Sequence, residues 1–245
     1  MEIPVEFSRK YFVTPGICNF RKELPVTHLI SNIIELATDH ANILGIGYKY
    51  LTPLGLGWVL SRLSFEMKRY PRFDENFTIT TWIEDWNRHF STRNFQVTGE
   101  DGEILGHIRT VWVIIDLENH SNAGTTSLQI DNSIVAGRPI PVEPVKRVHH
   151  PEPSLIRDYV FRYTDIDFYG HVNTVKYVEL LVNQFPISKY KDYFIQRFDI
   201  FFRKEARFGE EVKINISEIE SDKYVLALTR NSDLIVESQI SFGKE

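Results

Sequence analysis

The sequence repeats one order of elements, and this repeat limits the folds that the chain can adopt. An amphipathic helix is predicted for residues 28–44, where Ile33, Leu36 and Leu44 recur at helical spacing. A second amphipathic helix is predicted for residues 172–185 from the same rhythm. Alternating apolar segments follow each helix. A helix followed by several strands, found twice in 245 residues, predicts two similar units in one chain.

The segments behind the two helices correspond in pattern. Residues 205–214 match residues 70–79, and each lies 135 positions after its counterpart. Both segments lead into an alternating strand. Short turns at residues 100–102 and 231–233 predict that the strands beside them pair antiparallel. The predicted strands cover residues 77–83, 94–98, 108–116, 212–216, 224–230 and 234–242.

A long helix followed by an antiparallel sheet is the plan of a hotdog unit, in which the sheet wraps around the helix. We therefore expect an α+β chain with a tandem (double) hotdog fold. Hotdog units usually pair, so a fused chain would form internally the dimer that single-unit relatives build from two chains. The alternative is a chance likeness between two amphipathic patterns.

A proline-rich stretch separates the two halves. Residues 131–155 contain five of the 11 prolines and show neither helical nor alternating spacing, which predicts an extended linker. The expected N-terminal hotdog domain therefore covers residues 1–130. The expected C-terminal hotdog domain covers residues 156–245.

Composition argues against several classes of protein. A net charge of -5 disfavours a general nucleic-acid binder. Cys18 is the only cysteine, so it can form no intrachain disulfide and no cysteine cluster for a metal, and an unreactive thiol is expected. Charges interrupt the apolar runs, and the first residues lack a signal-peptide pattern. These features predict a cytoplasmic protein without a membrane span.

The residues that best suggest chemistry lie just before the second predicted helix. Asp167, Gly170 and His171 form a D-x-x-G-H pattern. Glycine permits close approach of a ligand, and a helix that begins near His171 would offer backbone N–H groups to an oxyanion. The carboxylate of Asp167 would act on an attacking water or fix the tautomer of the histidine. The alternative is that these are ordinary cap and turn residues.

Glu205 is the second candidate carboxylate. Its counterpart in the first half is Tyr70, and Glu23 is the only acid in the first-half region that matches the D-x-x-G-H segment. This asymmetry predicts one active site per chain. The alternative for Glu205 is a solvated charge between Arg203 and Lys204.

These segments resemble the motifs of a known enzyme family. Residues 164–177 look like the T-D-L-D-x-N-Q-H-V-N-N-V-K-Y segment of plant and bacterial acyl-acyl-carrier-protein thioesterases, and residues 202–206 resemble their Y-R-R-E-C block. In the first half, residues 58–62, 69–73 and 81–83 are similar to the W-V-x-x-R, K-Y-P-x-W and T-W-V blocks. The resemblance implies a double hotdog hydrolase of fatty acyl-acyl-carrier-protein that acts in fatty acid biosynthesis.

The resemblance also implies roles for individual residues. Asp167, His171 and Glu205 fall on the catalytic aspartate, histidine and glutamate of the family. We expect direct attack by water, activated and positioned by the two carboxylates with help from the histidine. No cofactor and no metal is required. Ala206 stands where the family has a cysteine, which argues against a thiol acyl-enzyme.

One position departs from the family pattern. Tyr169 stands where the family has a catalytic asparagine. Either the hydroxyl of Tyr169 or the carboxamide of Asn173 would have to replace it. Together with Gly170, these two residues are the predicted substrate-binding residues. Glycine before histidine is nearer to single-hotdog acyl-coenzyme A thioesterases.

The family resemblance implies a partner, an acyl-carrier protein that holds the acyl chain on phosphopantetheine. The resemblance implies that the acyl chain enters the first half of the protein. Its tunnel would be lined by residues that could equally form an ordinary core, namely Ile43, Trp58, Leu60 and Trp82. The carrier would dock on a basic cluster, or that cluster is a solvated strand face; its members are Arg197, Arg203, Lys204 and Arg207. A homodimer is also compatible with the sequence. The alternatives are an acyl-coenzyme A thioesterase, a hotdog dehydratase and a non-catalytic acyl-binding protein.

Overall fold

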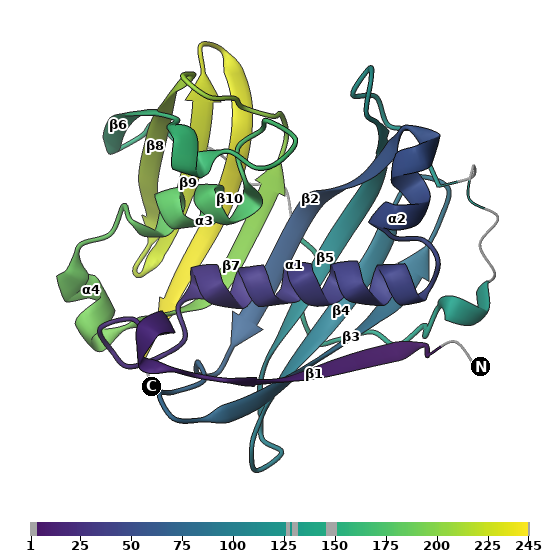
Figure 1. Cartoon of the computed structure of the whole chain (residues 1–245). Helices are drawn as coiled ribbons and strands as arrows, with labels where there is room; N and C mark the ends of the chain where they lie inside the picture. Colours follow the sequence, from purple (N-terminus) through teal and green to yellow (C-terminus); the bar gives the residue numbers. More distant parts are fainter. Residues whose placement is uncertain (1–3, 126–127, 129–131, 146–150, 245) are drawn as a thin grey trace. The chain divides into compact units, whose positions relative to one another are not determined.

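The computed structural model describes residues 4–125, 128, 132–145 and 151–244. The chain forms two compact units (Figure 1). The first unit contains residues 1–61 and 70–143, and the second contains residues 62–69 and 144–245.

An antiparallel sheet and a long helix form the first unit. The strand order is β1-β3-β4-β5-β2. The strands are β1 (Glu6–Phe12), β2 (Leu56–Met67), β3 (Asn76–Trp86), β4 (Ser91–Gly99) and β5 (Ile104–Asp116). The helices are α1 (Val26–Ile43) and α2 (Tyr48–Leu51), with short 3-10 turns at Pro15–Ile17, Thr52–Leu54 and Asn132–Ile134. Helix α1 lies across the sheet because Leu29, Ile33 and Leu36, spaced three to four residues apart, bury one face against it (Figure 1).

The second unit has the same plan with a shorter central helix. Its strand order is β7-β10-β9-β8-β6, and residues 62–66 of β2 pair antiparallel with β7. The strands are β6 (Leu155–Val160), β7 (Phe194–Phe202), β8 (Glu211–Glu220), β9 (Lys223–Arg230) and β10 (Asp233–Gly243). The helices are α3 (Thr174–Val182) and α4 (Ile187–Asp192), with a 3-10 turn at Tyr163–Asp165. The buried residues Val178 and Leu181 line one side of α3.

The predicted α+β class is confirmed, because each unit combines an antiparallel sheet with a helix across it. The second predicted helix was too long at both ends. Asn173 caps α3, and the chain turns before Pro186, which cannot continue the hydrogen-bond ladder of a helix, so residues 187–192 form a separate helix. In the described part of the chain, no helix is long and apolar enough to cross a membrane.

Part of the predicted linker packs on the first unit. Val135 forms a parallel bridge with Ile83, and the N–H of Ala136 donates to the carbonyl of Ile83 at 2.9 Å. The indole N–H of Trp82 donates to the carbonyl of Arg138 at 2.7 Å. These residues are therefore edge structure and not an unattached linker. Residues 131 and 146–150 of the predicted linker lie outside the described residues.

A buried polar contact lies between α1 and the sheet of the first unit. The imidazole of His40 is fully buried, with Nε2 2.9 Å from the carbonyl oxygen of Pro4 and Nδ1 2.8 Å from Nη1 of Arg93. A guanidinium can only donate, so Nδ1 accepts and Nε2 carries the proton. Burial, assisted by the charge of Arg93, lowers the pKa of His40 to about 4.

We expect this histidine to make the protein less stable in mild acid. Between pH 6.5 and pH 4 the unfolded chain binds a proton at His40 that the folded chain does not, so the free energy of unfolding falls as the pH is lowered through this window. The full loss is on the order of 3 kcal/mol. Urea unfolding at pH 7, 5.5 and 4.5 should show a weaker pH dependence in His40→Gln than in the wild type. The control is His89→Gln, at an exposed histidine, and its free energy of unfolding should show the same pH dependence as that of the wild type.

Candidate active site

The loop before α3 is closed by the carboxylate of Asp167. Oδ1 of Asp167 accepts from the backbone N–H of Tyr169 at 2.9 Å and from that of His171 at 3.2 Å. The N–H of Gly170 donates to the carbonyl of Asp167 at 3.0 Å. Gly170 adopts φ +84°, a conformation that glycine adopts without strain. The N–H groups of Gly170 and His171 are therefore already bonded, and our expectation that they face an oxyanion was wrong.

The helix begins later than the D-x-x-G-H pattern suggested. The N–H of Val172 donates to the carbonyl of Ala206 at 2.9 Å, and Val172 forms a bridge with Ile166. These contacts hold Val172 in an extended segment. Oδ1 of Asn173 then accepts from the N–H of Val175 at 2.8 Å, so α3 starts at Thr174. His171 consequently lies in the loop and not in the first turn of the helix.

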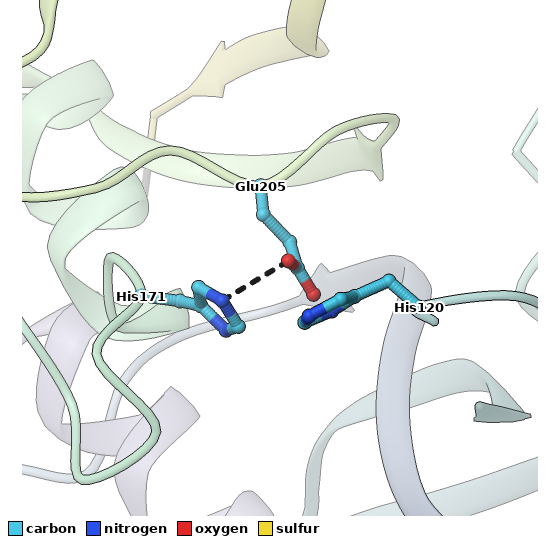
Figure 2. A group of neighbouring side chains, drawn as sticks. All are labelled: His120, His171 and Glu205. Carbon is cyan, nitrogen blue, oxygen red and sulfur yellow. Dashed lines mark ion pairs between the residues drawn. The ribbon is translucent and has the colours of Figure 1, made fainter. Parts of the chain in front are cut away.

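Glu205 meets His171 at this loop. Nε2 of His171 lies 3.1 Å from Oε2 of Glu205, and Figure 2 shows the two side chains pointing toward one another. The bridge between His171 and Arg207 places the two segments side by side. The side chain of His171 is 16% exposed and that of Glu205 is 35% exposed, so solvent reaches the pair. A neutral imidazole that donates from Nε2 has a proton acceptor at Nδ1, and a histidine–carboxylate pair of this kind can transfer protons.

Tyr177 of α3 holds the segment that carries Glu205. Its hydroxyl oxygen accepts from the N–H of Ala206 at 3.1 Å. Burial raises the pKa of Tyr177, so the phenol stays neutral. Nη1 of Arg230 donates to the carbonyl of Glu205 at 3.3 Å. Sequence reasoning gave Tyr177 no role, although it lies in the V-K-Y part of the family-like segment.

We expect Tyr177→Phe to lower the free energy of unfolding by about 1–3 kcal/mol, because the buried N–H of Ala206 loses its acceptor. The rate of the thioester hydrolysis that the family resemblance implies should fall as well, since the backbone next to Glu205 is no longer fixed from the helix. Thermal unfolding and thiol release measure the two effects. Tyr163→Phe, at a side chain that is 84% exposed, is the control and should change neither. Unchanged stability in Tyr177→Phe would contradict this role.

The other carboxylate of the T-D-I-D segment has a structural position. Asp165 is buried, and its Oδ2 accepts from the N–H of Arg162 at 2.7 Å and from the hydroxyl of Tyr159 at 2.9 Å. The carbonyl of Asp165 accepts from the N–H of Asn173 at 2.8 Å. Asp165 thus joins β6 to the start of α3. The sequence analysis placed the catalytic aspartate at Asp167 and gave Asp165 no role.

The first unit contains a second copy of the turn. Oδ1 of Asn19 accepts from the N–H of Arg21 at 2.9 Å and from that of Glu23 at 3.1 Å. The N–H of Lys22 donates to the carbonyl of Asn19 at 3.0 Å, and Lys22 has φ +61°. Each of these residues lies 148 positions before its counterpart in the turn of Asp167. The hydrogen bonds of Asp167 therefore require an oxygen acceptor but not a charge.

The side chains that suggest chemistry occur in only one copy. Glu23 stands at the position of His171 and forms the equivalent bridge, with Arg72. Its carboxylate pairs with Arg21, whose Nε lies 2.9 Å from Oε2. Tyr70 stands at the position of Glu205. Among the described residues, the turn of the first unit therefore has no equivalent of the pair of His171 and Glu205.

The predicted substrate-binding residues lie on or beside the loop. Tyr169 is 39% exposed, and its ring packs on that of Phe168 with centroids 4.0 Å apart. Gly170 is exposed. Asn173 is half-buried, and its carbonyl oxygen is used by the helix cap, so its NH2 group is the part that can donate to a ligand.

Comparisons with known proteins agree over nearly the whole chain. The family models for the acyl-ACP thioesterase N-terminal and C-terminal domains match residues 4–126 and 148–243. The chain is 23% identical over 217 residues to the acyl-[acyl-carrier-protein] hydrolase FATB3 of Cuphea viscosissima, covering 83% of this chain and 52% of that protein. It is 22% identical over 252 residues to the palmitoyl-acyl carrier protein thioesterase of Gossypium hirsutum, covering 97% of this chain and 58% of that protein. The chain thus spans little more than half the length of these relatives.

Two solved structures share the fold. An acyl-ACP thioesterase from Bacteroides thetaiotaomicron is 28% identical, with a TM-score of 0.87 and 98% of both chains covered. The 12:0-ACP thioesterase from Umbellularia californica is 17% identical, with a TM-score of 0.84 over 99% of this chain and 98% of that one. The second likeness supports the fold alone.

Proposed function

We propose that this chain, which belongs to the acyl-ACP thioesterase family, hydrolyses fatty acyl-acyl-carrier-protein to a free fatty acid and the carrier protein. The observation that carries the proposal is the contact of 3.1 Å between His171 and Glu205. This contact occurs in the unit that has both groups and not in the equivalent turn of the first unit as described, where Glu23 and Tyr70 take their places. The second unit is therefore the proposed catalytic unit, and the first unit is the proposed acyl-binding unit.

In the proposed reaction, water attacks the thioester carbonyl. Glu205 accepts one proton of the water while the water oxygen bonds to the carbonyl carbon. The tetrahedral oxyanion then collapses, the carbon–sulfur bond breaks, and the sulfur takes a proton through His171. Asp167 places the water with Oδ2, because its Oδ1 already accepts two backbone N–H groups.

The oxyanion needs a donor other than the amides of the closed turn. We assign this role to a side chain, either the hydroxyl of Tyr169 or the NH2 group of Asn173. Both residues belong to the loop and its helix cap. Such donors stabilise a developing charge when they are held in place before the reaction.

The predicted carrier-docking cluster is largely neutralised by acids of its own unit. Nε of Arg197 lies 2.7 Å from Oδ2 of Asp199. Arg203 pairs with Glu237, and Nζ of Lys204 lies 2.7 Å from Oδ1 of Asp233. Within the described residues, Arg207 is the member of the cluster that lacks an ion pair. The backbone of Arg207 also forms a β-bridge with that of His171, so Arg207 is the member that we propose for contact with an acidic carrier protein.

Thiol release from one acyl chain, offered either on acyl-carrier protein or on coenzyme A, tests the proposed function. We expect a higher kcat/KM with the carrier protein. Arg207→Ala should lower this value for the carrier-bound substrate and leave that for acyl-coenzyme A unchanged. A higher kcat/KM with acyl-coenzyme A would identify coenzyme A, and not the carrier protein, as the thiol part of the substrate. The absence of thiol release from both substrates would overturn the proposal.

A further inference from the structure

The first unit contains a cavity that the proposed catalytic step does not use. Its volume is about 50 Å³, and its walls are mainly aromatic and aliphatic. Thr38, which is exposed, is one of the residues that line it. The residues on which the inference depends are Trp58, Trp86, Trp112, Ser91 and Arg93.

Arg93 brings a buried cation to this cavity. The residue is 4% exposed, and its Nη1 donates to Nδ1 of His40 at 2.8 Å and to Oγ1 of Thr81 at 3.3 Å. Both acceptors are uncharged. Burial lowers the pKa of Arg93 to about 10, so the guanidinium is protonated at neutral pH. By contrast, Arg109 on the neighbouring strand β5 pairs with Glu84 at 2.9 Å.

The rest of the guanidinium is unsatisfied within the described part of the chain. The hydrogen bonds of Arg93 to His40 and Thr81 use Nη1 alone, while Nε and Nη2 are not among the fully enclosed polar atoms and so face space that a ligand or a water can reach. Desolvation is the one cause that shifts the pKa of Arg93. A buried cation without a counter-ion is costly, and structures rarely retain one without a reason. This cation therefore indicates a ligand that supplies negative charge.

Ser91 adds a second donor on the same face of β4. It is two residues before Arg93, so both side chains point to one side of the strand. Ser91 is 4% exposed and lines the cavity, so its hydroxyl can donate to a ligand there. A single water requires about 10–15 Å³ measured in this way, so the cavity accepts a group the size of a carboxylate.

We propose that this cavity binds the carboxylate of an aliphatic acid, with Arg93 and Ser91 on its oxygens, the tryptophans around its first methylene groups, and the chain leaving past Thr38. Guanidinium groups bind carboxylates through paired, charge-assisted hydrogen bonds. A thioester in the same place would offer only a neutral oxygen. The carboxylate has two sources: the free acid, which the proposed function would release, or the far end of an acyl chain. The site itself does not depend on the proposed function.

Tryptophan fluorescence reports this binding directly, because three of the four tryptophans line the cavity. We would titrate the full chain with decanoate and with decanol and confirm the binding by calorimetry. Decanoate should give a saturable change, and decanol should bind at least about tenfold more weakly, since it lacks the charge. Arg93→Met should weaken decanoate binding by about tenfold or more. Equal affinity for decanol and decanoate would overturn the proposal, as would no binding of any carboxylate.

The chain offers a matched control variant. Arg138 lies over the ring of Trp82, the fourth tryptophan, with 3.8 Å between the guanidinium carbon and the ring centroid. Arg138→Met removes an arginine that stacks on a tryptophan but lies outside the cavity, so decanoate should bind as in the wild type. If Arg93→Met does not fold, Arg93→Lys keeps the charge and loses the paired geometry, and binding should weaken severalfold. Wild-type affinity in a folded Arg93→Met would contradict the proposal.

Titrations with two thioesters distinguish a free acid from a carboxylate at the far end of an acyl chain. The probes are S-decanoyl-N-acetylcysteamine and its analogue with a carboxylate at the far end of the chain, titrated into Glu205→Gln to prevent hydrolysis. Binding of decanoate alone identifies the free acid as the ligand. Binding of the carboxylated thioester identifies a substrate carboxylate, and both results support the site. Binding is measured without turnover, so a failed hydrolase assay leaves this test intact.

Discussion

Glu205→Gln should lower kcat by about 10²–10⁴-fold, the usual contribution of a general base, and leave the stability close to that of the wild type. The glutamine oxygen can still accept from Nε2 of His171, which lies 3.1 Å from the carboxylate. It cannot take a proton from water. Single-turnover thiol release measures the chemical step, and thermal unfolding measures the stability.

Tyr70→Phe is the matched control, since Tyr70 stands at the position of Glu205 in the first unit. We expect its kcat to stay near that of the wild type. A Glu205→Gln variant that keeps a third or more of the wild-type kcat would rule out proton transfer by Glu205. His171 and Asp167 would then have to provide the base.

Asp167→Asn should separate the structural role of Asp167 from its chemical role. Asn19 makes the two equivalent hydrogen bonds in the first unit with a carboxamide oxygen, so the turn of the variant should close and its stability should change little. We expect kcat to fall by about 10²-fold, because a neutral group at this position no longer acts on the water. Asp167→Ala should in addition lose about 1 kcal/mol of stability, since the turn loses its acceptor.

The reverse change, Asn19→Asp, is the control for the substitution itself. It places the same carboxylate in the same turn of the unit that lacks the histidine–glutamate pair, and kcat should not rise or fall. Full activity in Asp167→Asn would show that Asp167 only shapes the loop. The catalytic assignment would then be reduced to His171 and Glu205.

Regular periodicity made most of the fold predictable. The apolar residues of α1 repeat at helical spacing, and the predicted helix begins within two residues of the observed one. Strand β4 was predicted too short at its start because Ser91, Thr92 and Arg93 are polar. Arg93 is buried because His40 supplies a hydrogen-bond partner from another element, which a local pattern does not reveal. Strand β1 was missed as well, since it alternates between exposed and half-buried residues and none of its seven residues is buried.

The site was predictable in its residue types but not in its backbone. The family-like motifs pointed to His171 and Glu205, which the structure brings together. The assignment of the N–H groups of Gly170 and His171 to the oxyanion was wrong, because Asp167 accepts from both within the turn, from the first with its carbonyl oxygen and from the second with Oδ1. The helix also starts two residues later than expected, because Val172 bonds to Ala206 across a long sequence separation. Contacts of this kind depend on the completed fold.

The paired turns also bear on how a chain of this fold can be redesigned. The backbone around Lys22 and Glu23 already has the bonds that surround Gly170 and His171, although it bears no acid–base pair in the described residues. A histidine–glutamate pair could therefore be introduced into the first unit by side-chain substitutions alone, without a change of the backbone. Glu23→His and Tyr70→Glu are the first two changes. Arg21 would then lose its carboxylate partner and would need replacement in the same round. The chain thus has two copies of one turn, and the copy in the second unit is the one with the histidine–glutamate pair.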